Sequence, residues 1–191
     1  MHVDKAIRTR RTHKLFAGGA IDDATLRELV ELASWAPNHR FTEPWRFAVV
    51  RHARLGAMKA EVLASLDGLA KDGDAESRRK LEQKRGKIAK RLDDAGAVVV
   101  VSWQRSTDDA ALDREDYAAT ACAVQNMLLA GTARGIVGIW STGAILLTPG
   151  MRAFYGVAAD HSIAAVVFLG SPKAELEGHR YKGVDDVMHW V

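Results

Sequence analysis

Hydrophobic residues recur along the chain with two different spacings, and the spacing indicates which segments are helices and which are strands. Apolar positions three or four residues apart predict helices over residues 22–36, 54–66 and 113–134. Continuous apolar runs predict strands at residues 46–51 and 163–170 and, most clearly, at 96–102. Because the last of these runs has no polar alternation, we expect it to be buried on both faces, at the centre of a sheet.

Local signals predict where the helices begin and end. Asp22 is a good N-cap for the first long helix, and Pro37 stops that helix because the residue before a proline avoids helical geometry. A short helix over residues 3–9 precedes a basic cluster, and Thr148-Pro149 predicts the start of another short helix that runs to Tyr155.

The segment from about Asp113 to Arg134, ended by Gly135, is the most apolar helix expected in the chain. Its pattern leaves little polar face, so we expect burial nearly all round. In a chain of this size, such a helix indicates a subunit interface as well as a core. The stretch 135–143 after it, rich in glycine with Ser141 and Thr142, is interpreted as a loop.

Residues 71–94 are mostly charged, which predicts an exposed helix or a mobile flap. Lys80, Lys84, Lys87 and Arg91 have helical spacing, and together with a sequence pI of about 9.1 they raise nucleic-acid binding as one function. Acidic residues interrupt this run and no aromatic residues are interleaved with it, so we favour a solvated helix and no nucleic-acid partner.

The chain has 191 residues, of which 48% are hydrophobic, and this is enough for one domain over residues 1–191 with a sizeable core. A net charge of +3 is mild but allows an anionic ligand. The single cysteine, Cys122, excludes an internal disulfide, suits a reducing compartment and is expected to be a small buried apolar residue. No signal-peptide pattern or long apolar span is present, so we expect a cytoplasmic protein without a membrane partner.

Common catalytic motifs are absent: the sequence has no phosphate-binding P-loop, no dinucleotide fingerprint and no metal-ligand spacing among its seven histidines. What remains is polar and aromatic loops and two basic clusters at residues 10–14 and 180–182. One loop, between Pro37 and Pro44, is either a packed corner or a ligand-binding connection. Guanidinium groups and a threonine hydroxyl suit a phosphate, and the alternative for residues 10–14 is an exposed basic N-terminal arm. Together these segments predict a site for a flat ring system that carries a phosphate.

Four motifs occur in a characteristic order, and through them the chain resembles the nitroreductase family of flavoproteins. The resemblance runs from about residue 5 onward and is nearest to a short bacterial branch that binds FMN. It implies an α+β fold with a mixed central sheet flanked by helices, and an interlocked homodimer with FMN sites at its interface. The motifs are Arg10-Arg11-Thr12, Ala36-Pro37-Asn38-His39 with Glu43-Pro44-Trp45, Gly138-Ile-Trp-Ser-Thr-Gly143, and Arg180-Tyr-Lys182 with His189-Trp190.

The resemblance also implies roles for individual residues. Arg10 and Thr12, with Arg11 beside them, would contact the phosphate and ribityl chain, and Arg180 or Lys182 would approach the phosphate. Trp35 and His39 would come from the partner subunit. The ring would be lined by Trp140, Ser141 and Thr142. A match at Ala130, Gly131, Thr132, Ala133, Arg134 and Gly135 suggests nicotinamide nucleotide binding, although a helix end explains the same residues.

The implied activity is transfer of electrons from NAD(P)H through FMN to electron-poor small molecules such as nitroaromatics or quinones, in a ping-pong cycle. Lys14 matches a cationic position in the family and is the candidate for stabilising the negative charge that a flavin gains on reduction. The chain departs from the family at Thr12, usually serine, and at Trp35, where a close branch has arginine. The alternative is a flavin carrier or sensor without significant turnover.

Overall fold

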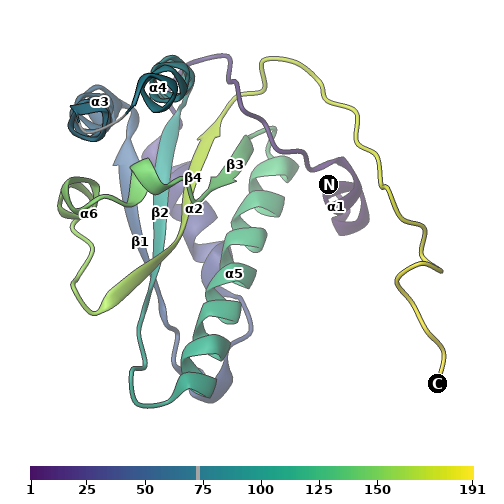
Figure 1. Ribbon diagram of the computed structural model, residues 1–191. Coiled ribbons are helices and arrows are strands. Elements are labelled where there is room, and N and C mark those ends of the chain that lie inside the picture. The colour runs from purple at the N-terminus through teal and green to yellow at the C-terminus, as the bar shows by residue number, and fades with distance from the viewer. Residues whose placement is uncertain (72–73) are drawn as a thin grey trace.

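The computed structural model describes residues 1–71 and 74–191, which form a layered α+β domain around a four-stranded sheet (Figure 1). The strand order is β1-β2-β4-β3, and every pair of neighbouring strands is antiparallel. The α+β class is confirmed, but the expected mixed sheet is antiparallel in its four strands. Within the described residues, parallel pairing is limited to an isolated bridge between Thr12 and Gly138. The strands are β1 (Trp45–Arg51), β2 (Ala97–Gln104), β3 (Val137–Ser141) and β4 (His161–Gly170).

Helices cover both faces of the sheet. In Figure 1, α3, α4 and α6 lie on one face and α2 and α5 on the other, while α1 packs against the outer side of α5. The helices are α1 (Val3–Thr9), α2 (Asp23–Ser34), α3 (Leu55–Lys71), α4 (Ala75–Asp94), α5 (Ala110–Ala133) and α6 (Pro149–Tyr155).

Strand β2 divides the core in two because its successive side chains point to opposite faces. Val98 and Val100 pack with α3, α4 and α6, whereas Val99 and Val101 pack with α2 and α5. All four are buried, as the unbroken apolar run predicts. The central strand therefore joins the two halves of the core.

Most predicted helix boundaries are confirmed. The Asp22 side chain accepts a hydrogen bond from Thr25 N at 2.8 Å, and Thr148 caps α6 by accepting from Met151 N at 3.3 Å. Helix α3 runs five residues beyond its predicted end, to Lys71. Helix α5 begins at Ala110 rather than Asp113, because Asp109 accepts hydrogen bonds from the backbone of the first turn.

The charged stretch that follows α3 forms an exposed helix, α4, which is one of the two predicted alternatives; residues 72–73 of that stretch lie outside the described residues. The helix is not entirely solvated, since Ile88 and Leu92 are buried against the sheet. Its basic side chains pair locally, as Lys80 does with Glu76 and Lys90 with Asp94.

Three expectations about α5 and the stretch after it are wrong for the single chain. Only one face of α5 is buried, and Cys122 lies exposed on the other face, away from the sheet. The glycine-rich stretch 135–143 is not a loop throughout, because its centre forms strand β3.

None of the described helices is long and apolar enough to cross a bilayer.

Residues 171–191 form an extended tail without a helix or strand, and every residue in it is exposed. The tail leaves the end of β4 and runs down past α1, so the beginning and the end of the described chain lie on the same side of the domain (Figure 1). This arrangement brings two distant basic segments together.

Candidate functional site

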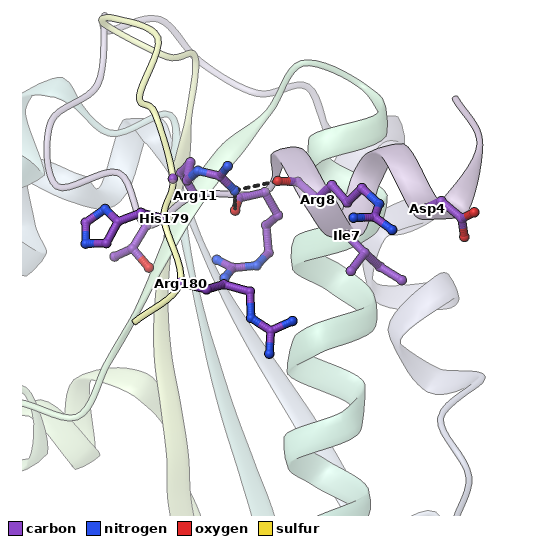
Figure 2. Close-up of a pocket in the computed structure, with 9 residues that line it drawn as sticks. Asp4, Ile7, Arg8, Arg11, His179 and Arg180 are labelled. Carbon is purple, nitrogen blue, oxygen red and sulfur yellow. Dashed lines mark hydrogen bonds between the residues drawn. The ribbon is translucent and has the colours of Figure 1, made fainter. Parts of the chain in front are cut away.

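A polar cavity of about 780 Å³ lies where the tail passes the end of α1 (Figure 2). Three segments build it: α1, the connection after α1, and the tail. The predicted basic clusters therefore meet in space through Arg10, Arg11 and Arg180. The lining residues are Asp4, Ile7, Arg8, Arg10, Arg11, Thr12, Gly178, His179 and Arg180.

The connection after α1 is fixed to the edge of the sheet. Thr12 forms a bridge with Gly138 of β3, and His13 N donates to the Gly138 carbonyl oxygen at 3.1 Å. At Gly138 a Cβ atom would approach the Phe168 carbonyl oxygen and a Leu128 methyl group at 2.9 Å. Glycine is therefore required for the close packing of β3 that positions the basic segment.

Positive charge dominates the cavity. Four guanidinium groups, from Arg8, Arg10, Arg11 and Arg180, line it together with one carboxylate, from Asp4. Within residues 1–71 and 74–191, the side chains of Arg10 and Arg180 make no hydrogen bond or ion pair. Guanidinium groups gathered without partners repel one another, and an anion that binds between them relieves that repulsion. The cavity thus has the donor set of a phosphate site.

A second cavity, of about 510 Å³, shares Thr12 with the first and is more apolar. Its lining includes Lys14 and Lys173 beside Leu15 and Leu176. His13 also contributes to it and is only 6% exposed, and this burial lowers the pKa of its imidazole. A polar and an apolar cavity that meet at Thr12 fit a ligand in which an anionic group is linked to an apolar ring.

Other residues expected at the site lie elsewhere in the single chain. Trp35 is 77% exposed, and its Nε1 donates to Glu31 Oε1 at 2.7 Å. His39 is exposed on the short turn after α2, with its Nδ1 3.9 Å from Glu115 Oε2. Neither residue lines the cavities described above, and both were expected to serve a second subunit.

The β3 residues and Lys182 also lie outside these cavities. Trp140 is half-buried at the end of β3, and its Nε1 donates to the Ala164 carbonyl oxygen at 2.9 Å. Ser141 and Thr142 follow at the strand end, with the Thr142 side chain exposed. Lys182 is exposed on the tail, so of the two basic tail residues Arg180 is the one at the polar cavity.

Residues 130–135 form the end of α5. Arg134 forms an ion pair with Glu28 and donates to the Ala130 carbonyl oxygen at 3.0 Å. The pair lowers the pKa of the Glu28 carboxyl and raises that of Arg134. Gly135 has φ of 73°, the left-handed geometry that ends helices. These contacts favour the helix-end interpretation, and the nicotinamide assignment stays a prediction.

Sequence reasoning missed several residues of the polar cavity. Asp4, Ile7 and Arg8 precede the predicted Arg11 at the spacing of a single helix face, a signal that extends the basic cluster back into α1. Gly178 and His179 carry no comparable signal, because only the path of the tail brings them to the cavity.

Comparison with known proteins supplies the family. The model of the nitroreductase family matches residues 7–171. The candidate NAD(P)H nitroreductase YfhC of Bacillus subtilis (strain 168) is 30% identical over 166 residues, which cover 87% of this chain and 82% of that protein.

Solved structures show the same fold. A nitroreductase with bound FMN from Bacteroides fragilis NCTC 9343 has a TM-score of 0.77 at 24% identity, covering 100% of this chain and 99% of that one. The FMN- and NADPH-dependent nitroreductase NfnB from a Sphigopyxis strain (HMH) has a TM-score of 0.78 at 18% identity, with the same coverage. With the family match over residues 7–171, these comparisons show that the chain belongs to the nitroreductase family.

Proposed function

We propose that this protein binds FMN and transfers electrons from NAD(P)H to an electron-poor small molecule such as a nitroaromatic compound or a quinone. The observation that carries the proposal is the pair Arg10 and Arg180, whose side chains have no hydrogen-bond or ion-pair partner among the described residues, at a polar cavity that meets an apolar one. The Bacteroides fragilis neighbour contains FMN, and the Sphigopyxis neighbour depends on FMN and NADPH. Relatives that use this cofactor support the same use here.

In this proposal the chain binds and orients the cofactor. Arg10 and Arg180 hold the phosphate through charge-assisted hydrogen bonds, and Thr12 lines both cavities. Lys14 provides a positive charge beside the apolar cavity. Bound FMN supplies the redox chemistry, which the side chains of this site lack.

We propose that donor and acceptor use the same open side of the site in turn, which is a ping-pong cycle. Parallel lines in a double-reciprocal plot of initial rates at several acceptor concentrations are the expected result. Intersecting lines would show that both substrates bind together and would overturn this part of the proposal.

The functional unit that we propose is a homodimer. Trp35, Phe41, Tyr181 and Trp190 are between 77% and 92% exposed in the single chain, far more than large aromatic side chains usually are. A second copy would cover them. It would also bring Trp35 and His39 of one copy toward the cavities of the other, whose lining among the described residues includes no tryptophan, tyrosine or phenylalanine.

The absorbance spectrum of the purified protein tests cofactor binding, provided that the released chromophore is identified by mass. FMN is expected, and a colourless protein that takes up no FMN would contradict the proposal. Addition of NAD(P)H under argon then separates the enzyme from a flavin carrier or sensor. Rapid bleaching of the bound flavin supports the oxidoreductase, whereas an unchanged spectrum would favour the carrier.

A further inference from the structure

The arginines at the polar cavity are not equivalent. Arg11 Nη1 donates to the carbonyl oxygens of Arg8, at 2.7 Å, and of Arg10, at 2.8 Å. These bonds tie the Arg11 guanidinium to the last turn of α1, as the dashed line to Arg8 in Figure 2 shows. Within the described part of the chain, the side chains of Arg8, Arg10 and Arg180 make no hydrogen bond or ion pair. The Arg11 guanidinium is therefore bound to the protein, and the other three are available to a ligand.

The tail lies directly on the Arg11 guanidinium. A Cβ atom built on Gly178 would overlap Arg11 Nε and Cζ, so a side chain at this position would require the Arg11 guanidinium to move away from the tail. Arg11 Nε is buried and has no hydrogen-bond partner. Because this nitrogen is buried, it is closed to a phosphate oxygen in this arrangement of the tail. Two residues further on, Arg180 lines the polar cavity.

We propose that Arg11 is a positioning residue that holds the tail at Gly178 and thereby places Arg180 beside Arg10. The inference rests on the proposed function for the identity of the ligand, but the contact between Arg11 and the tail exists without it. This proposal revises the role that the family resemblance implies, in which Arg11 lies beside Arg10 and Thr12 at the phosphate.

The first test is a double-mutant cycle on FMN affinity, measured by quenching of flavin fluorescence. Arg180→Ala removes a charged hydrogen bond and should weaken FMN binding by about tenfold or more. Arg11→Ala should weaken it comparably in the wild-type protein. Because Arg11 acts through Arg180, adding Arg11→Ala to the Arg180→Ala variant should weaken FMN binding by less than about a further twofold.

Arg8→Ala is the matched control in both backgrounds, because it removes one positive charge from the same cavity without touching Gly178. The loss of FMN affinity caused by Arg11→Ala is compared with the loss caused by Arg8→Ala in the same background. Fully multiplicative losses from Arg11→Ala and Arg180→Ala would show that Arg11 contacts the ligand independently, and would overturn the proposal.

A second test needs no flavin. Cleavage by a glutamate-specific protease after Glu175 or Glu177, next to Gly178, reports how firmly the tail is held in the ligand-free protein. Arg11→Ala and Gly178→Ala should both accelerate cleavage, and Arg8→Ala should not. Equal cleavage of the wild type and Arg11→Ala would overturn the tail contact. A wild type that binds no FMN but shows the expected cleavage pattern would refute the proposed function alone.

Discussion

His13 is a buried titratable residue between the basic segment and the sheet. Its burial lowers the pKa of the imidazole from the ordinary value of 6.5, so the folded protein holds this side chain neutral to lower pH than the unfolded chain does. Below pH 6.5 the unfolded state therefore binds more protons at this position. The contribution of His13 to stability is complete above that pH and declines as the pH falls.

We expect the free energy of unfolding to decrease between about pH 7 and about pH 5.5, measured by urea denaturation. His13→Gln should flatten this dependence, while His2→Gln, at an exposed position, should keep it. The carboxylates with lowered pKa, such as Asp22 and Asp113, titrate in more acidic solution and do not interfere. An identical slope in the wild type and His13→Gln would contradict the assignment.

Lys14 carries a prediction about the redox potential. Its side chain lines the apolar cavity, and its backbone carbonyl oxygen accepts a hydrogen bond from Arg91 Nε at 3.3 Å, which holds this part of the chain to α4. Lys14→Met should retain FMN, lower the midpoint potential of the bound flavin and slow its reduction by NAD(P)H, because the ring loses a neighbouring cation.

Lys173→Met is the matched control for Lys14→Met, since Lys173 lines the same cavity from the tail. If Lys14→Met leaves both the potential and the rate of reduction unchanged, Lys14 has no electrostatic role in the reaction.

At the scale of elements, strand β3 is an example of a structure that the sequence pattern does not predict. Gly138 occurs among glycine, serine and threonine residues, a composition typical of loops. In the structure this glycine is instead a packing requirement of a strand, pressed against Phe168 and Leu128. Sequence pattern alone cannot distinguish the two, because the neighbours that exclude a side chain come from β4 and α5.

One part of the candidate site can likewise be predicted from the sequence, and another part cannot. The meeting of Arg10, Arg11 and Thr12 with Arg180 follows from the charge pattern, since both basic segments need an anion. The different roles proposed for Arg11, which positions the tail, and Arg180, which contacts the ligand, do not follow from the charge pattern. That difference depends on where the tail backbone passes, and Gly178 is an ordinary glycine in the sequence.

The junction between β2 and α5 depends on one carboxylate. Asp113 accepts hydrogen bonds from Arg105 Nε at 2.8 Å, Trp103 Nε1 at 3.1 Å and Ser106 N at 3.1 Å. The Arg105 guanidinium is the main reason that the pKa of the Asp113 carboxyl is lowered. This network joins the end of the central strand to the first turn of the helix.

We expect Asp113→Ala to lower the free energy of unfolding by about 1–3 kcal/mol, because it leaves the Trp103 and Ser106 donors without their acceptor. Asp108→Ala, in the same connection, should change it by less than about 0.5 kcal/mol, because the Asp108 side chain accepts a hydrogen bond from the neighbouring Thr107 and, among the described residues, none from β2. Urea denaturation measures both. Equal effects of the two substitutions would show that the network contributes nothing specific.

At the scale of the whole molecule, the exposed face of α5 and the exposed tail predict a stable dimer. Light scattering of the flavin-loaded protein should give about twice the sequence mass of 20.8 kDa, and the mass should persist on dilution. A mass near that of one chain would mean that the exposed aromatic residues stay in water.

The closing of the polar cavity by the tail has a consequence for the order of events during synthesis. The cavity needs residues 10–12 and 178–180, and all four strands of the described sheet lie between these two segments. A chain that emerges from the ribosome can therefore assemble its sheet before Arg180 is available. The contact between residues 10–12 and 178–180 joins distant parts of the chain and is expected to form late. The cavity can therefore bind a phosphate-bearing ligand only after the tail has been translated.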